Sequence, residues 1–133
     1  MSPRPLPVHH LAVTMRDLAE GERFYGRILG LPEQRRWLDA EGALRSIWFD
    51  LGGGSFLAVE KTDAPAPPPG DAPGFHCVAL GIAAEERERW RARLAESAVP
   101  IERESDFTLY FRDPEHNLLG LSHYPTPRDR SQG

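Results

Sequence analysis

The chain has 133 residues, of which 40% are hydrophobic and 27% are charged, and its formal net charge is −4. This length and balance fit one ordinary globular domain or two small modules. The negative charge argues against nucleic acid as a partner, and no apolar run approaches the ~20 residues of a membrane span. The N-terminus has no hydrophobic export segment and Cys77 is the one cysteine, so we expect a reducing, cytoplasmic location.

The first half of the chain predicts a β-α-β-β-β order. Residues 8–15 alternate and carry β-formers, as in a strand. Asp17, with Glu20 three residues later, predicts a helix start, and Gly30 with Pro32 predicts its end. Further strands are predicted over 33–38, 44–51 and 55–60, which gives a first module over residues 8–61.

A proline-rich segment, residues 62–74, follows the first module and predicts a semi-rigid linker, since proline disfavours helix and strand interiors. The second module, residues 75–124, repeats the order of the first. It has a predicted helix over 83–97 and predicted strands over 75–82, 100–103, 107–112 and 117–124. Residues 125–133 are predicted to form a mobile tail.

Two such modules predict an α+β fold. Each would have an apolar sheet face that must be covered. Two tandem βαβββ modules satisfy this need if their mixed sheets curve around a shared cleft.

The two halves also match in sequence when residues 76–94 are aligned with residues 10–28. The identical pairs are His10/His76, Glu20/Glu86, Glu22/Glu88, Arg23/Arg89 and Arg27/Arg93. A histidine at the same place in each copy can bring two imidazoles together, and converging imidazoles suggest a metal site.

Side-chain alternation along the strands predicts which residues face the cleft. His10 faces it on the first strand, and Glu60 does so on the fourth. Cys77 is expected to face the helix layer, and His116 and His123 are expected on the solvent side. The other residues predicted to share the cleft face are Ala12, Thr14, Phe56, Ala58, His76, Val78, Leu80, Thr108, Tyr110, Arg112, Leu118, Gly120 and Ser122.

Several stretches resemble the vicinal oxygen chelate superfamily, which includes glyoxalase I, extradiol dioxygenases, fosfomycin-resistance thiol transferases and bleomycin-binding proteins. They are residues 10–18, 24–25, 28–31 and 110–118. The resemblance covers residues 8–124. It implies a homodimer, with the modules paired either within one chain or across two.

The resemblance also implies a metal site for iron, manganese, nickel or zinc, without an organic cofactor. The positions that correspond to the family's ligands are His10, Glu60, His76 and Gly120. Glycine cannot bind a metal, so His10, Glu60 and His76 would remain as a set of two histidines and one carboxylate. Glu60 would then serve as both ligand and catalytic base, or as ligand only.

The pocket walls are also assigned by resemblance. Trp48 and Phe56 correspond to pocket walls of family members, and Tyr110 and Thr108 to the tyrosine and hydroxyl residue of the thiol transferases. Arg112 on the same face could pair with an anionic ligand group, or instead with Asp113 or Glu104. Aromatic walls with few polar groups suit a small, partly apolar or planar ligand.

Two classes of function stay open. The first is a metal-dependent lyase, isomerase, dioxygenase or transferase acting on a small oxygenated or aromatic substrate through His10, Glu60 and His76. The second is a non-catalytic, drug-sequestering protein, because Gly120 removes a carboxylate and would open space for an aromatic ligand. Neither function involves nucleic acid or a membrane.

Overall fold

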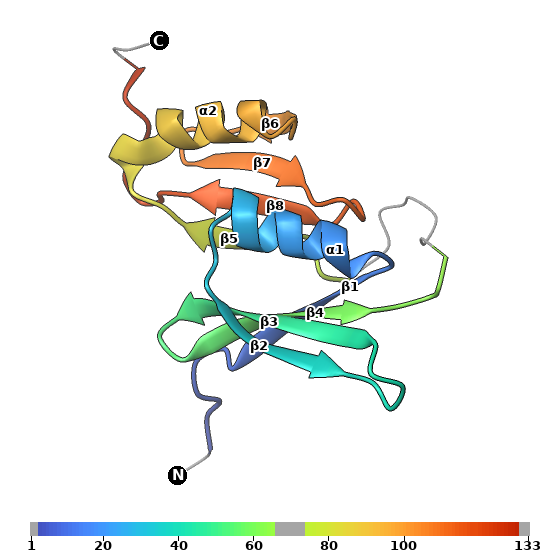
Figure 1. Ribbon diagram of the computed structural model, residues 1–133. Coiled ribbons are helices and arrows are strands. Elements are labelled where there is room, and N and C mark those ends of the chain that lie inside the picture. The colour runs from blue at the N-terminus through green and yellow to red at the C-terminus, as the bar shows by residue number, and fades with distance from the viewer. Residues whose placement is uncertain (1–2, 66–73, 131–133) are drawn as a thin grey trace. The chain divides into compact units, whose positions relative to one another are not determined.

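The computed structural model describes residues 3–65 and 74–130, and it forms two compact units, Met1–Ala66 and Pro67–Gly133 (Figure 1). Each unit has a four-stranded sheet and a helical segment. The predicted fold class is confirmed: the chain is α+β, with two tandem βαβββ modules. Most of the predicted linker, residues 66–73, lies outside the described residues.

The first unit follows the predicted order. Its sheet has the strand order β1-β4-β3-β2, in which β1 runs parallel to β4 and the other pairs are antiparallel. Its elements are β1 (His10–Met15), α1 (Leu18–Gly21), the π-helical segment η1 (Glu22–Ile28), β2 (Glu33–Leu38), β3 (Leu44–Gly52) and β4 (Ser55–Lys61).

The predicted helix start at Asp17 is confirmed. The carboxylate Oδ1 of Asp17 accepts hydrogen bonds from the amides of Ala19 at 2.9 Å and Glu20 at 3.4 Å, as an N-cap does. The π-helical segment was not predicted, because apolar spacing does not distinguish it from an α-helix. Its wider turns end with the amide of Leu29 bonded to the carbonyl of Phe24 at 3.0 Å.

The core of the first unit lies on one face of its sheet. Met15, Ile47, Phe49 and Val59 are each at most 1% exposed, and they occupy alternate strand positions. The helical segment adds Phe24 and Tyr25, which are 2% and 1% exposed. The opposite face of the sheet is therefore the one that remains for function.

The second unit has the strand order β5-β8-β7-β6 and a corresponding core of Leu94, Leu109, Phe111 and Leu121. Only β5 and β8 pair in parallel. The elements are β5 (Val78–Gly81), the 3₁₀ helix η2 (Ala84–Glu86), α2 (Arg87–Glu96), β6 (Ile101–Glu104), β7 (Thr108–Arg112) and β8 (Leu118–Ser122).

The predicted facing of β5 is wrong. Val78 pairs with Leu119 and Leu80 with Leu121, and both leucines are buried on the face opposite Gly120. The apolar residues of β5 turn to the helix side, as Leu11, Val13 and Met15 do in β1. The repeat that aligns His10 with His76 is therefore one residue out of step with the register of this strand. Cys77 precedes the strand and is exposed rather than placed under the helix.

The chain after β8, predicted to be a mobile tail, contacts the second unit as far as residue 130. The amide of Arg128 donates to the carbonyl of Asp106 at 2.7 Å, and its guanidinium lies 2.8 Å from Glu104. His123 is also not on the solvent side: it is 5% exposed, and its Nε2 lies 2.8 Å from Nη1 of Arg87. His116 is exposed, as predicted.

Across residues 3–65 and 74–130, no helix combines the length and apolar character needed to cross a membrane.

Candidate ligand-binding faces

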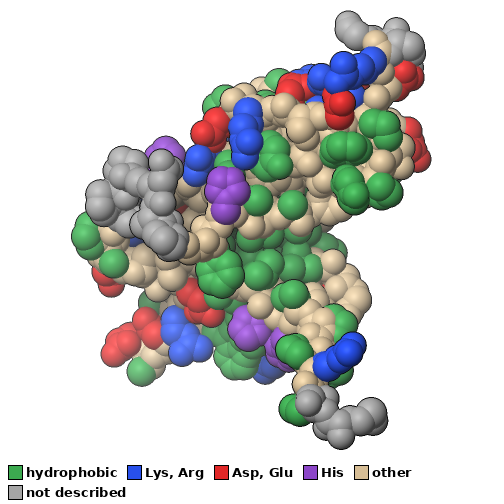
Figure 2. All heavy atoms as spheres, turned by 180° about the vertical axis from the view of Figure 1, so that it is seen from behind, with side chains coloured by type: hydrophobic (Ala, Val, Ile, Leu, Met, Phe, Trp, Pro, Cys, Tyr) green, Lys and Arg blue, Asp and Glu red, His purple; other side chains and the backbone are tan. Residues whose placement is uncertain are grey.

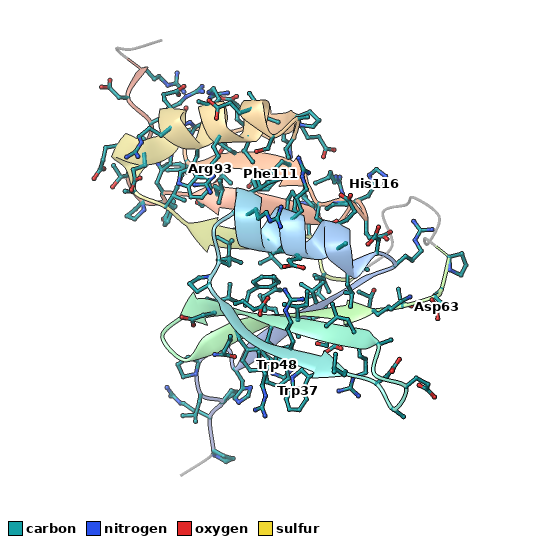
Figure 3. All side chains as sticks on the ribbon, viewed as in Figure 1. Trp37, Trp48, Asp63, Arg93, Phe111 and His116 are labelled. Carbon is teal, nitrogen blue, oxygen red and sulfur yellow. The ribbon has the colours of Figure 1, made fainter. Side chains whose placement is uncertain are left out.

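A row of stacked rings crosses the first sheet on the face away from its core. His10 stacks on Phe56 with ring centroids 4.9 Å apart, and Phe56 stacks on Trp48 at 4.3 Å. Trp37 continues the row, 5.3 Å from Trp48. Figure 3 shows the two indoles side by side on the side of the sheet opposite α1. The sequence predicted Trp48 and Phe56 for this face but missed Trp37.

A β-bulge explains why the residues from β2 were missed. Glu33 pairs with Phe49 and Arg35 with Trp48, so Gln34 is an extra residue in the strand. The bulge places Arg35 on the ring face, where its guanidinium lies 4.1 Å from the Trp37 ring centroid. Counted from Glu33, which pairs with the core residue Phe49, simple alternation would have put Arg35 on the other face.

Three buried polar atoms on this face have no hydrogen-bond partner: Nε1 of Trp37, Nε1 of Trp48 and Oγ of Ser46. Among the described residues one further side-chain atom shares this state, Nε of Arg87. Each unpaired buried donor costs about 1–3 kcal/mol. All three atoms lie on the same face of the first sheet, so a hydrogen-bond acceptor bound there could lower this cost.

Glu60 shares the face with His10, as predicted, but the two residues do not converge. His10 pairs with Phe56, whereas Glu60 lies four residues further along β4, between Thr14 and Ser46. Four strand residues span about 13 Å. The residue that stands opposite His10 is thus a phenylalanine, which cannot bind a metal.

The second sheet carries Thr108, Tyr110 and Gly120 on one face, as predicted, because Gly120 pairs with Tyr110 and Thr108 with Ser122. A Cβ atom on Gly120 would lie 2.9 Å from Cγ2 of Thr108 and 3.5 Å from the Tyr110 ring. The space expected to open at this glycine is therefore filled by its neighbours.

His76 lies before β5 and is exposed. Its Nε2 is 3.5 Å from Nη2 of Arg103, whose guanidinium lies 4.2 Å from the centroid of the Tyr110 ring. Arg103 was missed from the sequence because a second bulge, at Glu102, turns it onto the Tyr110 face: Ile101 pairs with Phe111 and Arg103 with Tyr110.

Arg112, predicted to meet an anionic ligand group, has a protein partner instead. Its Nε and Nη2 donate to the carboxylate of Glu102 at 2.6 and 3.1 Å, and Nη1 donates to the carbonyl of His116. The hydrogen bonds from Arg112 lower the pKa of Glu102. The partner is therefore neither of the two acids expected, Asp113 and Glu104.

The residues present do not fit the metal site that the resemblance implies. Glycine stands at position 120, His10 and Glu60 are separated along their strands, and His76 lies beside a guanidinium cation. Within the described ranges no group of three or more His, Cys, Asp or Glu side chains could hold a metal ion.

The family model described as the Glyoxalase/Bleomycin resistance protein/Dioxygenase superfamily matches residues 8–121. The chain belongs to this superfamily. No curated protein matches the chain in sequence. The two sheets with their helical segments are the architecture expected of a member.

Solved structures of the superfamily are similar in fold. A glyoxalase/dioxygenase from Nostoc punctiforme is 21% identical with a TM-score of 0.76, over 95% of this chain and 99% of that one. A mutant of the fosfomycin resistance protein FosX from Listeria monocytogenes, complexed with Mn(II) and 1S,2S-dihydroxypropylphosphonic acid, is 20% identical with a TM-score of 0.72, covering 90% and 93%. Lactoylglutathione lyase from Agrobacterium tumefaciens is 22% identical with a TM-score of 0.66, covering 92% and 96%.

Proposed function

We propose that the chain is a non-catalytic binding protein that holds a planar, partly apolar small molecule against the ring row of the first sheet. The observation that carries this proposal is the unbroken contact from His10 through Phe56 and Trp48 to Trp37. Aromatic surfaces of this kind contribute binding energy by area and by ring geometry.

The unpaired polar atoms on this face support the same function. A ligand that offers acceptor oxygens or nitrogens to the indole groups of Trp37 and Trp48 would relieve their unpaired state, after small side-chain rotations. The hydroxyl of Ser46 and the half-buried carboxylate of Glu60 stand next to each other on β3 and β4. They would add polar contacts that orient the ligand, a role that does not require Glu60 to bind a metal or to act as a base.

The other function considered, a metal-dependent enzyme, is favoured by membership in a superfamily whose member FosX was crystallised with Mn(II). The donor set of this chain speaks against it, because the carboxylate expected at position 120 is a glycine and a phenylalanine faces His10. We therefore propose that this chain binds a small molecule and does not catalyse a reaction on it.

A fluorescence titration with the neutral planar probe 1-naphthol tests the proposal. The titration is made in a Trp90→Phe background, so that the signal comes from Trp37 and Trp48 alone. We expect saturable quenching, and Trp48→Leu should weaken the affinity about tenfold or more, because a ring contact is lost.

Trp90→Phe without further change is the matched control, since Trp90 belongs to α2 of the other unit. The proposal fails if the probe does not saturate the protein, or if Trp48→Leu binds it as well as the control does.

A further inference from the structure

Arg103 stands out on the second sheet because the chain deforms locally to place it. The bulge at Glu102 turns the side chain of Arg103 onto the face that carries Tyr110, where its guanidinium packs on the phenol ring at 4.2 Å. The same device places Arg35 beside Trp48 on the first sheet. Bulges of this kind commonly re-aim side chains next to functional sites.

The guanidinium of Arg103 is not neutralised by a carboxylate hydrogen bond in the described part of the chain. Within residues 3–65 and 74–130, the guanidinium has Nε2 of His76 as a hydrogen-bonding neighbour, at 3.5 Å. Other arginines of this unit are paired: Arg112 with Glu102, and Arg87, Arg91 and Arg128 with Glu104. Arg103 therefore has guanidinium N–H groups to offer to a ligand.

The surroundings of Arg103 consist of hydrogen-bond donors and small side chains. Among the described residues, the row of paired strand positions beneath it runs from Tyr110 to Gly120 and Ala79, none of which is acidic. The hydroxyl of Ser122 lies on the same face and accepts hydrogen bonds from the hydroxyl of Thr108 at 2.9 Å and from the amide of Tyr124 at 3.4 Å. The two acidic neighbours of Arg103 in sequence are engaged by other arginines: the carboxylate of Glu102 accepts from Arg112, and that of Glu104 pairs with Arg87, Arg91 and Arg128.

From these contacts we propose that Arg103, seated on Tyr110 and flanked by His76, is the binding site for an oxyanion group, either a carboxylate or a phosphate or phosphonate. A planar guanidinium presents paired N–H groups that match such anions. Stacking on Tyr110 fixes its orientation before the ligand arrives, which reduces the entropy lost on binding. The site lies in the second unit and does not depend on the ring row of the first.

The test is a calorimetric titration of the full chain with methylphosphonate, and separately with acetate, at low ionic strength. Saturable binding of at least one of the two anions is expected, and their relative affinities identify the preferred oxyanion. Arg103→Gln should weaken binding about tenfold or more. Arg103→Lys should retain part of the affinity, because lysine keeps the positive charge but lacks the paired N–H groups of a guanidinium.

Arg89→Gln is the matched control. It removes one positive charge from an exposed position on α2 and is expected to change the anion affinity less than twofold, roughly, since exposed charges act weakly over distance. Arg103→Gln should also bind 1-naphthol normally, so failure of the anion site is distinguishable from failure of the ring-row function.

The inference is overturned if neither anion binds, if Arg103→Gln binds as tightly as the unaltered chain, or if Arg112→Gln abolishes binding while Arg103→Gln does not. Equal thermal unfolding midpoints for Arg103→Gln and the unaltered chain would exclude misfolding as the source of a loss.

Discussion

Gly120 determines how closely two neighbouring side chains pack on the second sheet. A side chain at this position would meet the methyl group of Thr108 at 2.9 Å, a distance that real Cβ contacts do not show. Thr108 cannot simply rotate away, because its hydroxyl donates to Ser122 at 2.9 Å. The superfamily pattern places a carboxylate at this position. Here the residue is a glycine, and the present position of the Thr108 methyl group leaves no room for a side chain.

We predict that Gly120→Ala lowers the free energy of unfolding by about 1–3 kcal/mol, the range for overpacking a well-filled site. The penalty should shrink in a Thr108→Ser background, because serine removes the clashing methyl and keeps the hydroxyl bonded to Ser122. Urea denaturation of the two single variants and the double variant measures this coupling.

Additive effects in that cycle would contradict the prediction. They would show that the Thr108 methyl group is not the obstacle to a side chain at position 120.

Among the elements, α2, β6 and the chain after β8 are held together by one acidic residue. Glu104 of β6 pairs with Arg91 and Arg87 of α2 at 2.9 and 3.2 Å, and with Arg128 at 2.8 Å. Figure 2 shows basic and acidic side chains together near the C-terminal end of the chain. Arg87 is 3% exposed, so the network reaches into the interior. It also connects Arg128, in the chain after β8, to β6.

The pKa of Glu104 carries a prediction about pH. The hydrogen bond from Arg91, followed by that from Arg87, lowers this pKa from 4.5 to about 2. Glu104 therefore stabilises the fold above about pH 4.5, and this contribution is lost as the pH falls toward 2. We expect Glu104→Gln to cost about 1–2 kcal/mol at pH 7, after allowance for solvent screening.

The difference in free energy of unfolding between Glu104→Gln and the unaltered chain should be smaller at pH 3 than at pH 7. Urea unfolding at both pH values measures it. Glu88→Gln is the control, since its carboxylate is 66% exposed and exposed pairs contribute less than about 1 kcal/mol. A difference for Glu104→Gln that is the same at pH 3 and pH 7 would contradict the assignment.

The sequence allowed the elements to be predicted well where alternation is strict, and poorly where it is broken. Strand β2 was predicted at its observed bounds, and β3 and β4 each end one residue later than expected. The bulges at Gln34 and Glu102 were not predictable, because a bulge leaves no mark in the composition of a strand. Each bulge nevertheless reverses the face on which the following arginine lies, Arg35 or Arg103.

At the scale of the whole molecule, the internal repeat correctly predicted two modules of the same fold. It did not align the first strands of the two modules correctly. The helical stretches align at the spacing between His10 and His76, whereas β1 and β5 align one residue later, with Leu11 matching Val78. The pair of rows Arg35–Trp48–Ala58–Ala12 and Arg103–Tyr110–Gly120–Ala79 shows the true correspondence. Each unit thus presents an arginine beside an aromatic residue on its helix-free face.

That correspondence changes what the whole molecule is expected to do with a metal. In the strand register, the counterpart of His10 in the second unit is Cys77 rather than His76, and the residue paired with His10 on β4 is Phe56. Each unit by itself offers an arginine and aromatic rings, the groups on which the two proposed binding sites depend. The part of the chain that the structure describes holds no group of three or more His, Cys, Asp or Glu side chains that could bind a metal ion.

We therefore predict that the thermal unfolding midpoint of the full chain changes by less than about 1 °C when the protein is stripped with EDTA or supplied with Mn(II). A metal present at 100 times its dissociation constant would add about 2.7 kcal/mol to the free energy of unfolding, which for a chain of this size raises the midpoint by roughly 10 °C. Differential scanning fluorimetry resolves the two outcomes easily. A rise in the unfolding midpoint with Mn(II) that His10→Ala abolishes would establish metal binding at His10. It would then favour the metal-dependent enzyme over the non-catalytic binding protein.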